Sequence, residues 1–394
     1  MYNIPRMPGL SLDAFRARFP ILGRRVYVNS CSQGALSTDV EAAFGAFTAS
    51  WHAGGSPWED WIGQVERLRA RAAAAIGADP DEVAIVPSAS AAIASIASAL
   101  TFEAPRSEVV LGDLEFPTMA HAWRAQEARG ARIVPVAAPG GTLSVDAYAA
   151  RVGRRTRIVP FTHVGFRTGD RLDAARLIAL CHERGALAFL DDYQRTGTGP
   201  IDVHALGVDV LVTGALKYLL GAPGVAFLYV RRALAGTLTP LVTGWMGRAD
   251  PFAFAAEPLD WGAGARRFEM GTPPIPNVCA AAAGIELLER AGLGAVERQI
   301  AHLVERFAAG SAARGFVPLT PADPARRGAL VVLRALDAPQ LVRRLEGRGI
   351  IASARGDGLR VSFHAYNTDA DVDAVLEALE AEAALLARAA AAVP

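Results

Sequence analysis

The chain has 394 residues, and its 40 Lys and Arg residues balance 40 Asp and Glu residues, so its formal net charge is zero. This length predicts two or three structural units, and 52% hydrophobic against 20% charged residues excludes a mainly disordered chain. Balanced charge argues against a nucleic-acid partner. No apolar run of about 18 residues, secretory leader or CxxC pair is present. We therefore expect a cytoplasmic enzyme or binding protein with no membrane partner and no metal.

Predicted helices and strands alternate through the first 290 residues. Ser56-Pro57-Trp58-Glu59 has the form of a capping box, and apolar residues recur at helical spacing from there to Gly77. Short apolar strands then alternate with helices, which indicates a mostly parallel sheet covered on both faces. The predicted strands are Val83–Val86, Val109–Leu111, Ile133–Val136, Ile158–Phe161, Ala186–Leu190 and Val208–Val212.

The C-terminal part has the pattern of a smaller α+β unit. We expect helices over 280–290, 296–313, 338–349 and 368–391, and strands over 329–333, 350–354 and 359–363. We place a large α/β domain over residues 40–290. Residues 1–39 and 291–394 are expected to form the small domain.

Ligands of an open α/β sheet bind at the carboxyl ends of its strands, so polar residues there are the candidates for chemistry. Ser90 opens a helix whose N-terminus could hold a phosphate, although an ordinary N-cap is the simpler interpretation. Asp191 ends a strand and could hold a cationic group, or could serve as a turn residue. Phe116 could stack on a ring bound there, or could be a core residue.

Lys217 is the only lysine in the chain, and all the other residues in the count of Lys and Arg are arginines. It lies in the apolar stretch that follows Val208–Val212. A desolvated amine has a lowered pKa and can act as a nucleophile or carry a proton. A phosphate site, a carboxylate and such an amine together suggest pyridoxal 5′-phosphate.

Several stretches then resemble the class V aminotransferase family of fold-type I pyridoxal-phosphate enzymes. This family includes kynureninases, cysteine desulfurases, selenocysteine lyases and isopenicillin-N-epimerase-like proteins. The resemblance runs from about Tyr27 to the C-terminal helix. Its most specific stretches are Leu190-Asp191-Asp192-Tyr193-Gln194, Thr213 to Gly221, Gly271-Thr272-Pro273, and Arg360-Val361-Ser362 to Thr368.

The resemblance implies a role for each matching residue. Lys217 would be the Schiff-base lysine, Asp191 the partner of the pyridine nitrogen, and Gln194 a contact of the ring hydroxyl. Arg360 would clamp the substrate carboxylate. It also implies a homodimer. Further expected contacts are Ser90, Ala91 and Thr213 at the phosphate, Thr272 and Trp245 from a partner subunit, and Asn29 and Arg355 in the specificity pocket.

The resemblance also implies a fold and a class of reaction. We expect a large domain with a mostly parallel seven-stranded sheet and a small α+β domain. Residues 353–358, where desulfurases carry a reactive cysteine, contain none. Thr162–Gly169 resembles a kynureninase segment. We therefore expect a lyase that breaks a bond at Cβ of a small L-amino acid. The main alternative is an aminotransferase. An epimerase and a non-catalytic protein of this fold are weaker alternatives.

Overall fold

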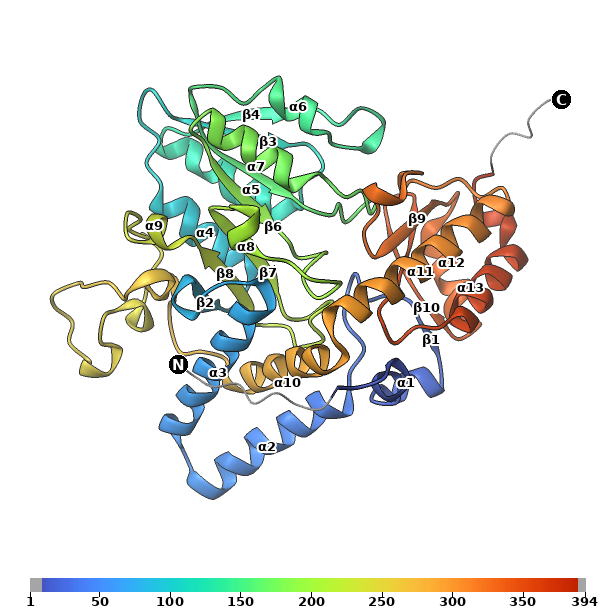
Figure 1. Ribbon diagram of the computed structural model, residues 1–394, viewed down its shortest axis with the longest axis horizontal. Helices are drawn as coiled ribbons and strands as arrows, with labels where there is room; N and C mark the ends of the chain where they lie inside the picture. Colours follow the sequence, from blue (N-terminus) through green and yellow to red (C-terminus); the bar gives the residue numbers. More distant parts are fainter. Residues whose placement is uncertain (1–8, 389–394) are drawn as a thin grey trace.

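The computed structural model describes residues 9–388, and its larger part is built on a seven-stranded sheet (Figure 1). The strand order is β2-β8-β7-β6-β5-β3-β4. All neighbours are parallel except β8, which is antiparallel to both β2 and β7. The strands are β2 (Val83–Val86), β3 (Glu108–Gly112), β4 (Arg132–Val136), β5 (Thr156–Thr162), β6 (Leu187–Asp191), β7 (Val210–Gly214) and β8 (Ala226–Val230).

The expected fold class, with its mostly parallel sheet, is confirmed, but β8 was not predicted. A loop over 215–225 joins β7 to β8 without a crossover helix, so the chain returns antiparallel.

Both faces of the sheet are buried. On β6, Phe189 packs into one hydrophobic cluster, while Ala188 and Leu190 pack into the other. Helices α4 (Ala89–Ala99) and α5 (Pro117–Arg124) cover the first face. The second face is covered by α3 (Trp58–Ile76), α7 (Ala174–Glu183) and α10 (Ile275–Ala291).

The capping box expected at Ser56 is wrong. Helix α3 begins at Trp58, its N-cap is Pro57, and no side chain caps it. The preceding helix α2 (Thr38–Gly54) ends so close that the Ser56 amide donates to the Gly54 carbonyl, which leaves Ser56 one residue too early to cap α3.

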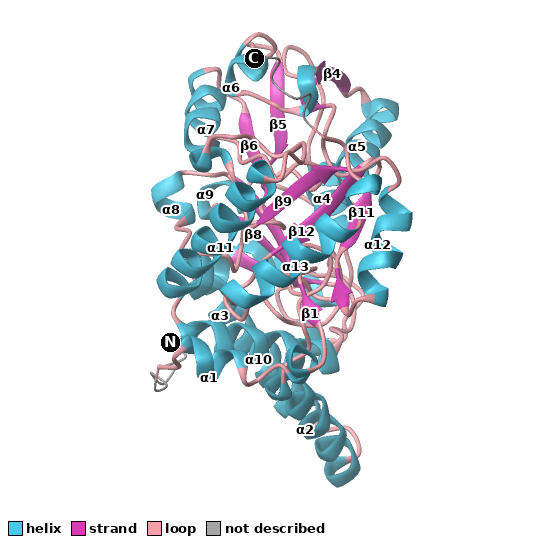
Figure 2. Cartoon of the chain, turned by 90° about the vertical axis from the view of Figure 1, so that its right-hand side faces the viewer, coloured by secondary structure: helices cyan, strands magenta, loops and turns pink. Residues whose placement is uncertain are grey.

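The smaller part contains a three-stranded antiparallel sheet in the order β11-β12-β9 (Figure 2). Its strands are β9 (Leu330–Arg334), β11 (Ser353–Arg355) and β12 (Gly358–Ser362), and its helices are α11 (Leu293–Ala313), α12 (Ala338–Gly347) and α13 (Asp369–Ala381).

Two expectations for this part need correction. The strand expected over 350–354 is split, because β10 (Ile350–Ile351) pairs instead with β1 (Val26–Tyr27). The last helix ends at Ala381 rather than 391, because the chain turns so that buried Leu386 bridges to Ala335. The end of that expected helix, 389–391, lies outside the described residues.

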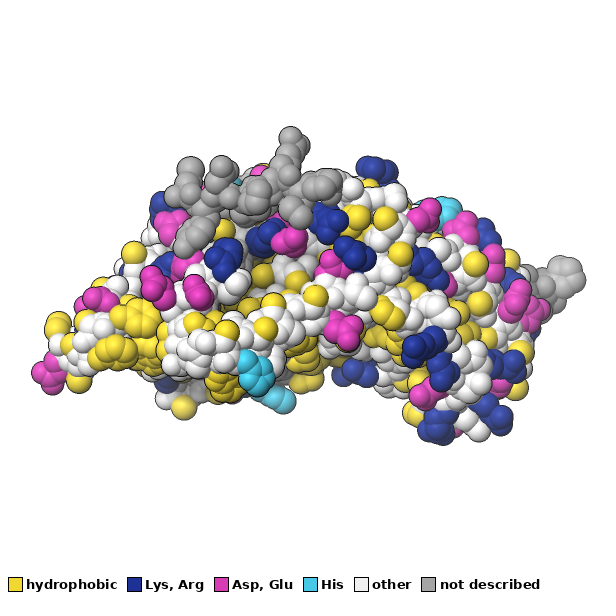
Figure 3. Space-filling model, turned by 90° about the horizontal axis from the view of Figure 1, so that it is seen from below, with side chains coloured by type: hydrophobic (Ala, Val, Ile, Leu, Met, Phe, Trp, Pro, Cys, Tyr) yellow, Lys and Arg dark blue, Asp and Glu magenta, His cyan; other side chains and the backbone are white. Residues whose placement is uncertain are grey.

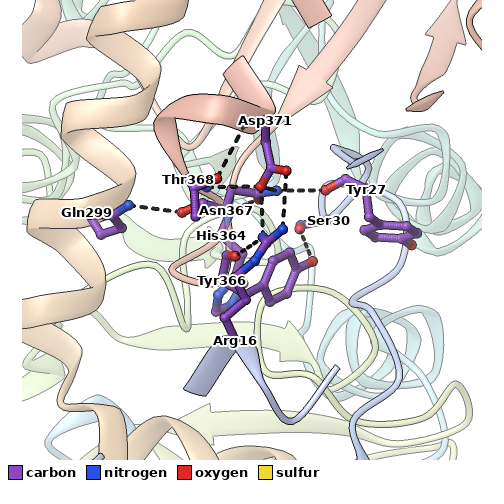
Figure 4. Close-up of polar contacts among 9 residues, drawn as sticks. All are labelled: Arg16, Tyr27, Ser30, Gln299, His364, Tyr366, Asn367, Thr368 and Asp371. Atoms are coloured by element: carbon purple, nitrogen blue, oxygen red, sulfur yellow. Dashed lines mark hydrogen bonds and ion pairs between the residues drawn. The ribbon is translucent and has the colours of Figure 1, made fainter. Parts of the chain in front are cut away.

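The N-terminal segment is tied to this smaller part by buried polar contacts (Figure 4). Arg16, the last residue of α1 (Leu12–Arg16), donates to Asp371 over 2.8 Å. The hydroxyls of Ser30 and Tyr366 lie 2.6 Å apart. These contacts fix the segment that leads into Cys31. No helix within residues 9–388 is long and apolar enough to cross a membrane.

Candidate active site

One cavity of about 340 Å³ lies between the central sheet and the β11–β12 hairpin. On the sheet side it is lined by residues of β5 and β6 and by the segments that follow β2, β3 and β7. Its volume is at the small end of the range for ligand pockets. Seven of the residues expected at the site line it: Ser90, Phe116, Asp191, Gln194, Lys217, Arg355 and Arg360.

Lys217 reaches this cavity from the segment after β7. Its amine lies 4.3 Å from the centre of the Tyr193 ring. Burial lowers the pKa of Lys217 to about 8, and the nearby Asp191 carboxylate acts in the opposite direction. A useful fraction of the amine is therefore unprotonated near neutral pH, as a nucleophile or base requires.

Asp191 is the last residue of β6 and is buried. Burial raises its pKa to about 6, while the Tyr193 amide, which donates to Oδ1 over 3.0 Å, and the Lys217 charge act against this rise. The carboxylate therefore remains mostly ionised at neutral pH. Its neighbour Asp192 does not line the cavity and lies 2.6 Å from Nδ1 of His163.

The N-termini of α4 and α5 meet at one end of the cavity. The Ser90 hydroxyl lies 3.1 Å from the hydroxyl of Thr118, a residue that the sequence interpretation missed. Helix N-termini with adjacent hydroxyls favour a phosphate group. Ala91 does not line the cavity, because its amide donates to the Ser88 cap over 3.1 Å.

Two aromatic rings form another wall. Phe116 is 44% exposed and meets Phe166 edge to face, with ring centres 5.1 Å apart. Both residues line the cavity. The exposed ring of Phe116 is thus available to stack on a planar ligand.

Buried polar atoms without partners test whether a cofactor fits. Gln194 donates from Nε2 to the Cys31 carbonyl over 3.1 Å, but its Oε1 is buried and has no partner within residues 9–388. The same holds for the hydroxyl of Thr213, which lies outside the cavity lining. A ring hydroxyl could donate to Gln194 Oε1. With the amine, the carboxylate and the two helix N-termini, this donor set fits pyridoxal phosphate.

The substrate side of the cavity is dominated by Arg360 of β12, which is 1% exposed. Its guanidinium donates to the Ser32 hydroxyl over 2.6 Å, the Ser353 hydroxyl over 2.9 Å and the Phe166 carbonyl over 3.2 Å. These contacts hold a planar, permanently charged group in one orientation, as recognition of a carboxylate requires.

Cys31 also lines this cavity. It is 1% exposed, and its backbone carbonyl accepts from Gln194. The thiol is therefore both buried and beside the site.

Three other expected residues do not line the cavity of this single chain: Trp245, Thr272 and Asn29. Trp245 packs against Phe252 and Phe254, and Thr272 is exposed. Asn29 bridges to Ser362, and its Oδ1 is buried without a partner in the described part of the chain.

A buried acid stands behind the cavity wall and was also missed. Glu115 accepts from the hydroxyl of Thr162, which lines the cavity, and from that of Tyr148 over 3.1 Å. Burial raises the pKa of Glu115 to about 7, although the Thr162 hydrogen bond opposes this rise. Glu115 is therefore a third group, after Asp191 and Lys217, whose pKa lies near neutral pH.

Comparisons with known proteins agree with this geometry. A family model described as Aminotransferase class-V matches residues 47–375. The protein described as "Uncharacterized aminotransferase YcbU" of Bacillus subtilis is 34% identical over 370 residues, which cover 94% of this chain and 98% of its own. A kynureninase of Deinococcus radiodurans is 30% identical over 395 residues, covering 91% of this chain and 92% of its own.

A solved cysteine desulfurase from Thermococcus onnurineus has a TM-score of 0.85 at 21% identity. The match covers 95% of this chain and 99% of that one, and it concerns the fold. The resemblance to a family of pyridoxal-phosphate enzymes is thus confirmed, and the chain belongs to the aminotransferase class-V family.

Proposed function

We propose that this protein is a pyridoxal-phosphate enzyme that breaks a bond at Cβ of a small L-amino acid. The observation that carries the proposal is the presence of Lys217, Asp191 and Arg360 in one cavity of about 340 Å³. An amine, a carboxylate and a guanidinium there match the three needs of such chemistry, which are a base, a partner for the ring nitrogen and a carboxylate clamp.

Bound pyridoxal phosphate would supply an electron sink for the bonds at Cα of the substrate. Ser90 and Thr118, at the N-termini of α4 and α5, would hold its phosphate. Asp191 would keep a proton on its ring nitrogen, and Phe116 would stack on its ring. Arg360 binds the substrate carboxylate and thereby orients Cα. Lys217, with its pKa lowered to about 8, accepts the proton from Cα.

The choice of a lyase is supported by the kynureninase relative, 30% identical, and by the kynureninase-like segment Thr162–Gly169. The alternative is transfer of the amino group to a keto acid, which is favoured by the Bacillus subtilis relative that is described as an aminotransferase. The hairpin loop over 356–357 is too short for a reactive cysteine arm and contains no cysteine, which argues against a desulfurase.

The visible absorption of the holoenzyme, recorded with single amino acids and no keto acid, separates the two reactions. A lyase returns to its starting spectrum while a cleaved product accumulates over many turnovers. Stoichiometric conversion to the amino form of the cofactor, with no cleaved product, would establish the aminotransferase instead.

We also propose that the enzyme acts as a cytoplasmic homodimer. Exposed apolar side chains lie on the loop that projects from the larger part, at the left end of Figures 1 and 3: Leu241, Val242, Phe252, Phe254 and Leu259. An exposed apolar patch of this kind marks an interaction surface. A second copy seated there would let Trp245 and Thr272 approach the partner's cavity. Sedimentation of wild-type protein and of Phe254→Asp, with Glu103→Gln as a surface control, tests this interface, and a monomeric wild type would overturn it.

A further inference from the structure

The β11–β12 hairpin holds a second arginine on the same face as the carboxylate clamp. Ser353 pairs with Arg360, and Arg355 pairs with Gly358. Side chains of paired residues share a face, and so do residues two apart in a strand, so Arg355 and Arg360 both face the cavity that they line.

The position of Arg355 is set by a tight turn. Only Gly356 and Asp357 separate the paired residues Arg355 and Gly358, and Gly356 adopts a φ of +58° that favours glycine. A Cβ at Gly358 would overlap the Val332 side chain, so the position paired with Arg355 admits only glycine.

Arg355 lacks an anionic partner within the described residues 9–388. Its Nη1 donates to the Ala354 carbonyl over 2.7 Å, and it forms no ion pair there. The acid of the turn, Asp357, instead lies 3.5 Å from Arg334. The cavity lining therefore contains three cationic side chains, of Lys217, Arg355 and Arg360, against the single acid Asp191.

The cofactor phosphate does not account for this excess of positive charge. The phosphate end is built by Ser90 and Thr118 on α4 and α5, whereas Arg355 belongs to the hairpin with Arg360. Burial is the main cause of the lowered pKa of Lys217, and the positive charges of Arg360 and Arg355 lower it further. The charge of Arg355 therefore acts on the Lys217 amine. Arg355 thus lies on the substrate side of the cavity.

We propose that Arg355 selects a small amino acid whose side chain ends in an anion, a carboxylate or a sulfinate, while Arg360 binds its α-carboxylate. This inference rests on the proposed function, which assigns the α-carboxylate to Arg360. Two guanidiniums on one face repel each other, and a doubly anionic substrate relieves that repulsion and satisfies both. The small cavity limits the substrate to a short side chain.

The test compares short amino acids whose Cβ carries a group that can leave: cysteine sulfinate, which would release SO2, and aspartate, which would release CO2, against the neutral S-methylcysteine, which would release methanethiol. Wild-type holoenzyme should favour the acids in kcat/KM. Arg355→Gln should lower kcat/KM for the acids by about 10- to 100-fold, mainly through KM, and change that for S-methylcysteine by less than about twofold. Arg343→Gln, which removes the same charge from the exposed face of α12, should behave as wild type.

Calorimetric binding of succinate and propionate to the holoenzyme provides a second readout. Succinate should bind more tightly than propionate to wild type, and this difference should vanish in Arg355→Gln. An equal fractional loss of kcat/KM for cysteine sulfinate and S-methylcysteine in Arg355→Gln, or equal binding of succinate and propionate to wild type, would overturn the assignment. If no amino acid reacts, the proposed function fails, and the succinate comparison still decides whether Arg355 binds a second anion.

Discussion

The side chain of Tyr193 occupies the space in which a side chain at Gly214 would lie. A Cβ built on Gly214 would overlap the Tyr193 phenol. The same ring lies beneath the Lys217 amine. The glycine at position 214 is thus matched by a bulky neighbour that follows the adjacent strand β6.

Gly214→Ala should therefore destabilise the protein by about 1–3 kcal/mol, because the new methyl group overlaps Tyr193 in a buried site. Gly236→Ala is the matched control, since a Cβ there meets open space. Urea denaturation of both variants measures the effect. Gly214→Ala should cost less in a Tyr193→Ala background, where the ring that meets the new methyl group is absent. Equal stability of Gly214→Ala and Gly236→Ala would contradict this account.

Replacement of Lys217 by Ala should lower turnover by at least about 10²- to 10⁴-fold, the range for loss of a positioned proton-transfer group. The chain contains no other lysine that could substitute for it. Circular dichroism should show an intact fold. Turnover within about tenfold of wild type would remove Lys217 from the mechanism.

Arg360→Lys should raise KM for the amino-acid substrate by roughly 10- to 150-fold, since lysine cannot reproduce the planar two-point contact with a carboxylate. Steady-state kinetics and propionate binding measure this effect. Because Arg360 also contacts Ser32 and Ser353, the Tm of the variant serves as its control. An unchanged KM would place the carboxylate elsewhere.

Glu115 should make stability depend on pH. Burial raises its folded-state pKa to about 7, above the value of about 4.3 for an unfolded chain. Between about pH 4 and pH 7 the folded state therefore binds more protons than the unfolded state. The contribution of protonated Glu115 to the free energy of unfolding is thus full below about pH 4 and is lost as pH rises through 7.

Glu115→Gln should remove this loss, so its Tm should approach or exceed that of wild type as pH rises from 5 to 8. The gain in the free energy of unfolding is at most about 4 kcal/mol. Calorimetry of both proteins, with exposed Glu103→Gln as the control, provides the comparison. Parallel pH profiles would show that Glu115 does not titrate in this range.

Local sequence patterns point to Lys217 and Asp191, which the structure brings into one cavity. Lys217 stands out as a lone amine and Asp191 ends an apolar strand, and both features can be found without tertiary structure. The Thr118 hydroxyl at the phosphate end and the Ser353 hydroxyl that holds Arg360 could not be found in this way, because each meets its partner from a distant part of the chain.

The errors in the predicted fold have a similar cause. Strand β8 runs antiparallel to β7 because the loop that contains Lys217 reverses the chain. Helix α13 ends before the bridge that Leu386 forms with Ala335. Both features depend on partners distant in sequence. The roles proposed for Trp245 and Thr272 depend on the proposed second copy of the chain.

The contacts of Figure 4 join residues near opposite ends of the chain. Asn367 donates to the Tyr27 carbonyl, and Arg16 reaches Asp371, across 340 and 355 positions. During synthesis, residues 16–30 therefore cannot form these contacts until residues 366–371 have also left the ribosome. The wall formed by Cys31 and Ser32 is therefore expected to be among the last parts of the enzyme to assemble, and contacts of such long range predict slow folding.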